Sequence, residues 1–223
     1  MKNFFEVLQN CSLFSQINES DLSALLTCLG AQVKSFPKKS IVLAEGSAAK
    51  NIGIVLSGSV SIEQVDYYGN RSVLTDAGPS EIFAEAFACA EVESIPIHVL
   101  SNEPSEIMFI ECHRILSACS NACAFHHQIL LNLMKNLANK TILFHQKIEV
   151  TSKRTTREKL MTYLMLQAQK HDSDSFTIPF DRQSLADYLA VDRSGLSAEI
   201  SKLRKEGALK SNKNHFTLLR HLL

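Results

Sequence analysis

"RQSLADYLAVDRSGLSAEISKLRKEGAL", residues 182–209, holds two short helical patterns joined by the three residues "AVD". Asp181 and Asp192 stand where the two patterns begin, and an Asp at that place can cap the free backbone N–H groups of a helix. The apolar positions of both patterns recur at helical spacing: Leu185, Ala186 and Leu189, then Leu196, Ile200 and Leu203. Because a link this short makes two helices cross steeply, the stretch predicts a helix-turn-helix.

Two short strands are predicted directly after this stretch. Gly207 ends the second helix, and "ALKSNKNHFTLL", residues 208–219, contains two strand patterns around the turn residues 211–214. We expect this hairpin to form a basic wing that rests against a phosphate backbone.

The outer face of the second helix is predicted to enter a DNA major groove, which is about 12 Å wide. Arg193 is the expected base reader, because its guanidinium can bond both O6 and N7 of guanine. Three residues face the same way and could add a hydrogen bond or a methyl contact: Ser194, Ser197 and Ala198. Four lysines are better placed for phosphates: Lys202, Lys205, Lys210 and Lys213.

The distribution of charge supports an anionic partner for the C-terminal part. The net charge of the whole chain is zero, but residues 1–150 carry 10 Lys and Arg against 15 Asp and Glu. Residues 151–223 carry 13 against 8, so the two parts have net charges of −5 and +5. This asymmetry predicts an acidic sensing or assembly part joined to a basic part that meets double-stranded DNA.

The N-terminal part has the pattern of an antiparallel β-sandwich or barrel. A short amphipathic helix is predicted within residues 18–29, and residues 32–110 consist of short β-rich runs separated by turn residues. Glycines at 46, 58, 69 and 78 recur at the spacing of such sheets. The clearest hairpin lies at residues 65–74, where Gly69 and Asn70 can adopt positive φ.

A long helix is predicted from about residue 121 to residue 150. Its apolar stripe has nearly heptad spacing: Ile129, Leu130, Leu133, Leu137, Phe144 and Ile148. A helix of about 28 residues would be about 42 Å long, so we expect the stripe to form a dimer seam rather than only to cover the chain's own sandwich. Thr155 and Glu158 then form a capping box that opens a new helix after a hinge.

Composition excludes several other classes of protein. The chain has 45% hydrophobic and 21% charged residues, no membrane-length apolar run and no signal-like N-terminus, so we expect a soluble cytoplasmic protein. Thiols or ligands are then more natural states than disulfides for its six cysteines. We find no P-loop, nucleophile elbow or paired-carboxylate motif and therefore do not expect an enzyme.

The order of these elements resembles the Crp-Fnr family of bacterial transcription regulators. The resemblance rests on "LAEG" and "LSGSVSIEQVDYYGNRSVL" in the N-terminal part and on the helix-turn-helix at residues 181–208. It implies an α+β protein of two domains: a jelly roll like a cyclic-nucleotide-binding domain, with a long dimerisation helix, and a winged helix-turn-helix. The corresponding ranges would be 1–120, 121–151 and 152–223. The resemblance further implies a homodimer on a two-fold-symmetric operator, a small-molecule effector, and RNA polymerase as a further partner.

The chain departs from the pattern of family members that bind cyclic nucleotides. Glu85 stands at the ribose position but follows Ala84, and Ile95 and Pro96 replace the Arg-Ser or Arg-Thr pair that neutralises the phosphate. Because a buried phosphate without a cation is costly, we do not expect cAMP in the usual mode. The expected pocket is apolar and uncharged, lined by Phe83, Glu85, Phe87, Ile95, Pro96 and Phe144.

Two other interpretations of the N-terminal part remain open. One is a redox, metal or haem sensor, for which "CHRILSACSNACAFHH", residues 112–127, offers the metal candidates Cys119, Cys123 and His127. Their spacing fits zinc poorly, so we expect mainly structural packing there and no permanently bound cofactor. Cys89 or His98 could hold haem, although such residues are far more often structural. The other interpretation is a DNA-binding protein without an effector.

Overall fold

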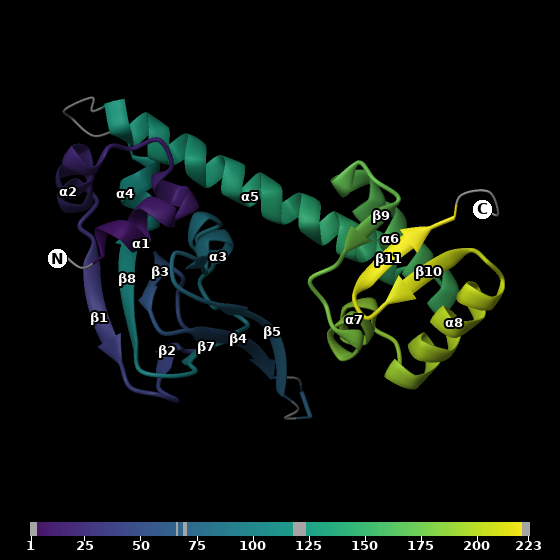
Figure 1. Ribbon diagram of the computed structural model, residues 1–223. Helices are drawn as coiled ribbons and strands as arrows, with labels where there is room; N and C mark the ends of the chain where they lie inside the picture. The colour runs from purple at the N-terminus through teal and green to yellow at the C-terminus, as the bar shows by residue number, and fades with distance from the viewer. Residues whose placement is uncertain (1–3, 66, 69–70, 118–123, 220–223) are drawn as a thin grey trace. The chain divides into compact units, whose positions relative to one another are not determined.

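A computed structural model describes residues 4–65, 67–68, 71–117 and 124–219 (Figure 1). The chain divides into two compact units, Met1–Asn139 and Lys140–Leu223. The division falls inside one continuous helix, α5 (Ala124–Thr151), between the sequence-based boundaries after residues 120 and 151. Among the described residues, no helix is both long and apolar enough to cross a membrane.

The first unit contains two four-stranded antiparallel sheets, as the sequence predicts. Their strand orders are β1-β8-β3-β6 and β2-β7-β4-β5. The strands are β1 (Gln32–Phe36), β2 (Ile41–Leu43), β3 (Asn51–Ser57), β4 (Val60–Val65), β5 (Arg71–Ala77), β6 (Ile82–Phe83), β7 (His98–Ser101) and β8 (Ser105–Glu111). The helices before α5 are α1 (Phe5–Asn10), a 3-10 turn at Ser12–Phe14, α2 (Glu19–Cys28), α3 (Glu85–Cys89) and α4 (Cys112–Leu116).

The predicted hairpin is β4 and β5, which pair antiparallel from Val60 opposite Ala77 to Val65 opposite Arg71. Its expected turn residues, Gly69 and Asn70, lie outside the described residues. The predicted pairing of the two strands is confirmed, and the predicted turn conformation stays a prediction.

Two hydrophobic cores hold the first unit together. One contains side chains of both sheets, including Val55, Val60 and Val99. The other contains side chains of α1, α2, α4 and α5 together with side chains of β3 and β8. In the first of these cores, Gly53 of β3 leaves room for the ring of Phe83, since a Cβ at position 53 would lie 2.1 Å from Cζ of Phe83. The ring of Phe83 therefore rests on bare backbone.

The apolar stripe of α5 is covered by the chain's own core only along its N-terminal half, so the expected dimer seam stays a prediction. Ile129 and Leu133 are fully buried in the first unit's own core, with Leu137 partly buried beside them. The sandwich offers an apolar surface to the N-terminal half of the helix, so the stripe is used there for intramolecular packing. The large apolar side chains left exposed on α5 are Met134, Ile142, Leu143, Phe144 and Ile148.

The second unit has the predicted helix-turn-helix and wing. Its elements are α6 (Thr156–His171), β9 (Ser175–Thr177), α7 (Arg182–Leu189), α8 (Arg193–Lys205), β10 (Leu209–Asn212) and β11 (His215–Leu218), with the sheet order β10-β11-β9. The wing turn is shorter than expected, because Ser211 and Asn212 still belong to β10 and only Lys213 and Asn214 connect the strands.

The caps predicted for α6, α7 and α8 are present. Thr155 and Glu158 form a reciprocal capping box at α6. The carboxylates of Asp181 and Asp192 accept hydrogen bonds from the backbone N–H of Ser184 at 2.7 Å and of Gly195 at 2.9 Å. Each carboxylate satisfies a backbone donor that the first helical turn leaves free, which explains where α7 and α8 begin.

Candidate nucleic-acid interface

Helix α8 separates a buried face from an exposed one. Leu196, Ile200 and Leu203 are buried in the core of the second unit. The predicted DNA-contacting residues lie on other faces of the helix: Arg193, Ser194, Ala198, Lys202 and Lys205 are exposed and Ser197 is half-buried. Arg193 is the first residue of α8, at the end of the helix that normally reads base edges in a helix-turn-helix.

Ser194 is engaged within the cap of α8. Its hydroxyl donates to the carboxylate of Asp192, and this bond, with the backbone N–H of Gly195, holds the pKa of Asp192 below its usual range. The hydroxyl proton of Ser194 is therefore occupied, and its oxygen remains able to accept a hydrogen bond. Ser194 fits a base donor such as an amino group better than a base acceptor.

Glu199 of α8 and Glu206, the residue directly after α8, both contact Arg157 of α6. One Nη atom of Arg157 in α6 lies 2.7 Å from Glu206, and the other lies 3.6 Å from Glu199. The hydrogen bond with Arg157 holds the pKa of Glu206 below its usual range, so that carboxylate stays ionised and paired. Because both glutamates contact Arg157, they neutralise little of the positive charge on the exposed face.

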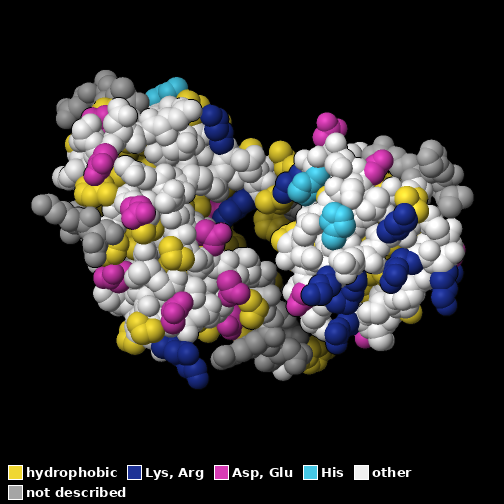
Figure 2. All heavy atoms as spheres, viewed as in Figure 1, with side chains coloured by type: hydrophobic (Ala, Val, Ile, Leu, Met, Phe, Trp, Pro, Cys, Tyr) yellow, Lys and Arg dark blue, Asp and Glu magenta, His cyan; other side chains and the backbone are white. Residues whose placement is uncertain are grey.

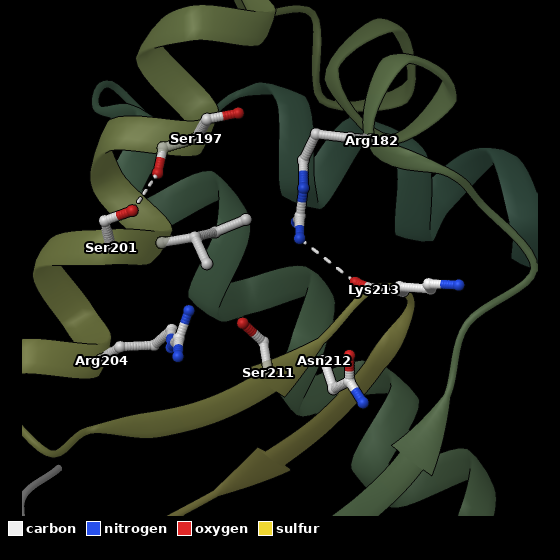
Figure 3. Close-up of a pocket in the computed structure, with 8 residues that line it drawn as sticks. Arg182, Ser197, Ser201, Arg204, Ser211, Asn212 and Lys213 are labelled. Atoms are coloured by element: carbon white, nitrogen blue, oxygen red, sulfur yellow. Dashed lines mark hydrogen bonds between the residues drawn. The ribbon is translucent and has the colours of Figure 1, made fainter.

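A groove of about 480 Å³ runs between α8 and the wing (Figure 3). It is lined by Arg182, Ser197, Ile200, Ser201, Arg204, Ser211, Asn212 and Lys213. In Figure 3 the side chain of Arg182 reaches from the start of α7 toward the wing turn, while Arg204 extends from α8 on the opposite side. Of these residues, only Ser197 and Lys213 were predicted from the sequence to contact DNA.

Arg182 ties the helix-turn-helix to the wing. Its Nη2 atom donates to the backbone carbonyl of Lys213 at 3.1 Å, and its guanidinium lies 5.6 Å from the ring centre of Phe216. Partial burial lowers the pKa of Arg182, but arginine stays charged at neutral pH. This link sets the position of the wing turn relative to α7, and no spacing in the sequence indicates it.

A second groove, of about 550 Å³, adjoins the first because Arg182 and Lys213 line both. Its other lining residues are Pro179, Asp181, Gln183, Arg193 and Asn214. The structure thus brings Arg193 and Lys213, predicted from two separate segments, to one groove. Lys202, Lys205 and Lys210 are exposed but line neither groove, so their expected phosphate contacts stay predictions.

The space-filling view agrees with the charge asymmetry of the sequence. On the face shown in Figure 2, Lys and Arg side chains gather over the second unit, whereas Asp and Glu side chains are scattered over the first. A concave, cationic surface with a helix N-terminus at its edge is suited to a polyanion such as DNA.

Three of the residues expected to line an effector pocket, Phe83, Phe87 and Ile95, lie in or against one hydrophobic core. Phe83 and Ile95 belong to the core between the sheets, and Glu85, at the start of α3, is 3% exposed. Phe87 is half-buried and Pro96 is exposed. Phe144 is 66% exposed and belongs to the second unit, so its part in a pocket stays a prediction.

Ala84 retains an unusual backbone conformation just before Glu85. Its φ is +61°, in the left-handed region that favours glycine. The turn from β6 into α3 therefore keeps the shape for which glycine is suited, at a cost in conformational energy. Ile95, where the family resemblance would place an arginine, is buried among apolar side chains.

The cysteine and histidine candidates have different surroundings. Cys119 and Cys123 lie outside the described residues, and His127 is exposed. Nε2 of His98 lies 3.1 Å from a carboxylate oxygen of Glu45. In the part of the chain that the structure describes, no three His, Cys, Asp or Glu residues are arranged to hold a metal ion.

Comparisons with known proteins agree with the two-unit architecture. The family model of the cyclic nucleotide-binding domain matches residues 33–122, and that of the Crp-like helix-turn-helix domain matches residues 158–221. A Mycobacterium tuberculosis protein described as a CRP-like cAMP-activated global transcriptional regulator is 34% identical over 80 residues. That match covers 36% of this chain and 35% of the relative, so the chain spans about a third of its length there.

Solved structures share the fold at low sequence identity. The c-di-GMP responsive global regulator CLP from Xanthomonas campestris is 17% identical with a TM-score of 0.56, and the alignment covers 90% of this chain and 99% of that one. The Thermus thermophilus catabolite activator protein is 17% identical with a TM-score of 0.50, and 93% of each chain is covered. With a sensor-type domain matched before the long helix and a Crp-like helix-turn-helix after it, the chain belongs to the Crp-Fnr family of transcription regulators.

Proposed function

We propose that this protein is a transcription regulator that binds double-stranded DNA as a homodimer, with α8 of each copy in a major groove. The observation that carries the proposal is the exposed position of Arg193 at the start of α8, beside a groove that it shares with Lys213 of the wing. A major groove accepts an α-helix, and the flanking cations can meet the phosphates on either side.

The dimer part of the proposal rests on α5. Three consecutive residues, Ile142, Leu143 and Phe144, are exposed, as is Ile148 one turn after Phe144. A helix that exposes this much apolar surface in water gains stability by pairing with a second copy. Two copies related by a two-fold axis would then present two α8 helices to a site with two-fold symmetry.

The effector, in this proposal, is a small molecule other than cAMP bound in the usual mode. The relative from M. tuberculosis is described as cAMP-activated and the Xanthomonas protein as responsive to c-di-GMP, but this chain has Ile95 and Pro96 at the phosphate position. Ile95 is buried, and its aliphatic side chain has no positive charge to meet a phosphate. A thermal-shift titration with cAMP should leave the melting temperature unchanged, and a saturable rise would overturn this part.

Replacing Arg193 tests the DNA-binding part. Operator sequences are selected from random duplex DNA with the full-length chain, and Arg193→Ala is then measured on the selected site by fluorescence anisotropy. We expect roughly 5- to 150-fold weaker binding, because a bidentate guanine contact contributes about 1–3 kcal/mol. Discrimination at one base pair of each half-site should also relax.

Lys50→Ala is the matched control, because it removes one exposed positive charge from the first unit. It should change affinity only slightly and equally for all sequences. Equal affinities for Arg193→Ala and Lys50→Ala on the selected site would remove Arg193 from base recognition. The alternative is a DNA-binding protein whose first unit binds no effector. A screen in which no metabolite changes the melting temperature or the DNA affinity would favour this alternative.

A further inference from the structure

Two cysteines that are far apart in the sequence meet at the junction of α3 and α4. The Sγ atoms of Cys89, the last residue of α3, and Cys112, the first residue of α4, lie 3.2 Å apart. Both are free thiols. The separation is about 1.2 Å longer than an S–S bond of ~2.05 Å, so a bond could form through small side-chain movements.

The two thiols have unequal access to solvent. Cys112 is 2% exposed in the core beneath α5, whereas Cys89 is partly exposed at its edge. Burial, and then the contact with Cys89, raises the pKa of Cys112 to about 12. Cys112 is therefore an uncharged thiol at neutral pH and is protected from oxidants in solution. Any reagent from solvent reaches Cys89 first.

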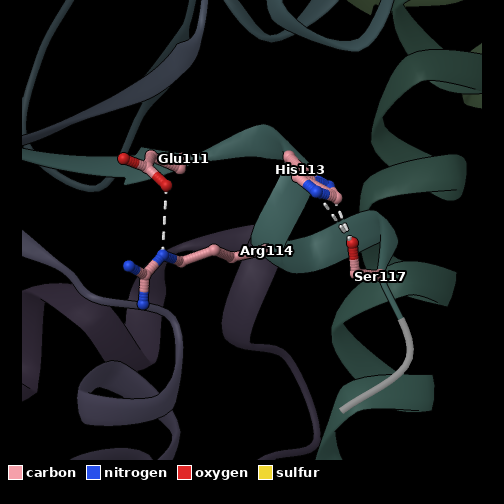
Figure 4. Close-up of polar contacts among 4 residues, drawn as sticks. All are labelled: Glu111, His113, Arg114 and Ser117. Atoms are coloured by element: carbon pink, nitrogen blue, oxygen red, sulfur yellow. Dashed lines mark hydrogen bonds and ion pairs between the residues drawn. The ribbon is translucent and has the colours of Figure 1, made fainter.

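Both helices are held in place by contacts that do not involve the sulfur atoms. Around α4, Nε of Arg114 lies 3.1 Å from a carboxylate oxygen of Glu111, and His113 bonds the hydroxyl of Ser117 at 2.7 Å (Figure 4). Arg114 also lies so close to Gly30 that a Cβ there would be 2.8 Å from its Nη1. The backbone N–H of Cys112 donates to the carbonyl of Lys50 at 2.9 Å.

The backbone of α3 and of the turn after it is held by local hydrogen bonds. The N–H of Ala88 donates to the carbonyl of Ala84 at 2.9 Å, and the N–H of Val92 donates to that of Phe87 at 3.1 Å. Ala88 is buried in the same core as Cys112. Because the surrounding backbone places both cysteines, the thiols are positioned for reaction before any oxidant arrives.

We propose that Cys89 and Cys112 form a reversible intramolecular disulfide when the protein meets a peroxide. The sulfur of Cys89 attacks one peroxide oxygen and the O–O bond breaks; the other oxygen leaves as an alcohol or water with the thiol proton. The resulting sulfenic acid is attacked by the sulfur of Cys112. The S–S bond forms, the S–O bond breaks, and water leaves with the proton of Cys112.

The two thiols lose two electrons and the peroxide gains two, so no further reductant or oxidant is needed. The product ties the end of α3, the helix that begins at Glu85, to the start of α4. This modification site does not depend on DNA binding, so its test is separate from that of the proposed function. A dithiol reductant should restore both thiols by exchange.

The test is mass spectrometry of the full-length protein after treatment with one equivalent of hydrogen peroxide, with remaining thiols alkylated during denaturation. Combined cleavage after Glu, Lys and Arg separates the peptides 86–91 and 112–114, each with a single cysteine. We expect these two peptides joined by a disulfide as the main oxidised product, and separated again after reduction.

Variants assign the order of the steps. In Cys89→Ser, Cys112 should remain fully alkylatable after the same treatment, and in Cys112→Ala, Cys89 should accumulate as a sulfenic acid trapped by dimedone. Cys28→Ser, at an exposed cysteine, is the matched control and should leave the yield of the 86–91 to 112–114 crosslink unchanged.

Two results would overturn the proposal. One is oxidation of Cys89 to the sulfinic acid while Cys112 stays a thiol in the wild-type protein. The other is a disulfide made mainly by other cysteines. Both are read on the wild-type chain, so they hold even if Cys112→Ala does not fold.

Discussion

Phe144→Ala should weaken self-association strongly. The side chain is 66% exposed on α5, and with about 200 Å² for a phenylalanine this leaves roughly 130 Å² to bury against a second copy. At about 25 cal/mol per Å² that area is worth ~3 kcal/mol per copy, and a two-fold dimer buries it twice. Complete burial would therefore raise the dissociation constant by between about 10⁴ and 10⁵, and burial of half of this area by about 10².

The assay is sedimentation velocity of the full-length chain over a wide concentration series. Val73→Ala is the control, because Val73 is 60% exposed on β5 of the first unit and lies away from α5 in the sequence. Alanine favours the helical state, so Phe144→Ala should keep the far-ultraviolet circular dichroism of the wild type. If Phe144→Ala and Val73→Ala gave the same dissociation constant, the exposed face of α5 would not be the dimer interface.

Three further predictions concern stability. Asp192→Ala should lower the urea midpoint and Asp192→Asn should recover most of it, because Asn caps nearly as well as Asp; equal midpoints for both would contradict the cap. Gly53→Ala should cost at least about 1–3 kcal/mol in urea unfolding, since its Cβ meets the ring of Phe83, and adding Phe83→Leu should recover part of this. The pKa values of Asp181, Asp192 and Glu206 are lowered in the folded state by their hydrogen bonds with Ser184, Ser194 and Arg157. The three carboxylates therefore stabilise the folded state fully above their unfolded pKa values of about 4, and this stabilisation is lost as the pH falls through the folded pKa values. Melting curves from pH 7 to pH 3 should show this loss. A constant melting temperature would contradict it.

The helix-turn-helix was predictable because its signals are local. Asp181 and Asp192 cap helices within three residues of themselves, and the apolar positions of α8 follow a single helical period. Short-range rules of this kind depend on backbone geometry alone. The same is true of the β4–β5 hairpin and of the capping box at Thr155.

What the sequence did not indicate depends on long-range contacts. Arg182 meets the carbonyl of Lys213 across 31 positions, and Cys89 meets Cys112 across 23. Likewise, Nζ of Lys147 in α5 lies 4.0 Å from the ring centre of Tyr188 in α7. No periodicity encodes such pairs, because they are set by the way whole elements pack.

The stripe of α5 shows the limit of periodicity most clearly. Ile129 and Phe144 belong to the same sequence pattern, yet the first is buried in the chain's own core and the second is exposed. A helical period shows that a face is apolar, but it does not show which surface covers that face. The core of the first unit covers the apolar side chains of α5 as far as Leu137, and the large apolar side chains from Ile142 to Ile148 are exposed.

Selection of duplex DNA from a random library by the full-length protein tests directly whether α8 of two copies recognises one DNA site. We expect an enriched site with two-fold symmetry, whose half-sites lie about 10–10.5 base pairs apart or at a multiple of that distance. We also expect a guanine in each half-site at which Arg193→Ala loses discrimination. Enrichment of no sequence, or of one without two-fold symmetry, would contradict DNA recognition by a two-fold dimer.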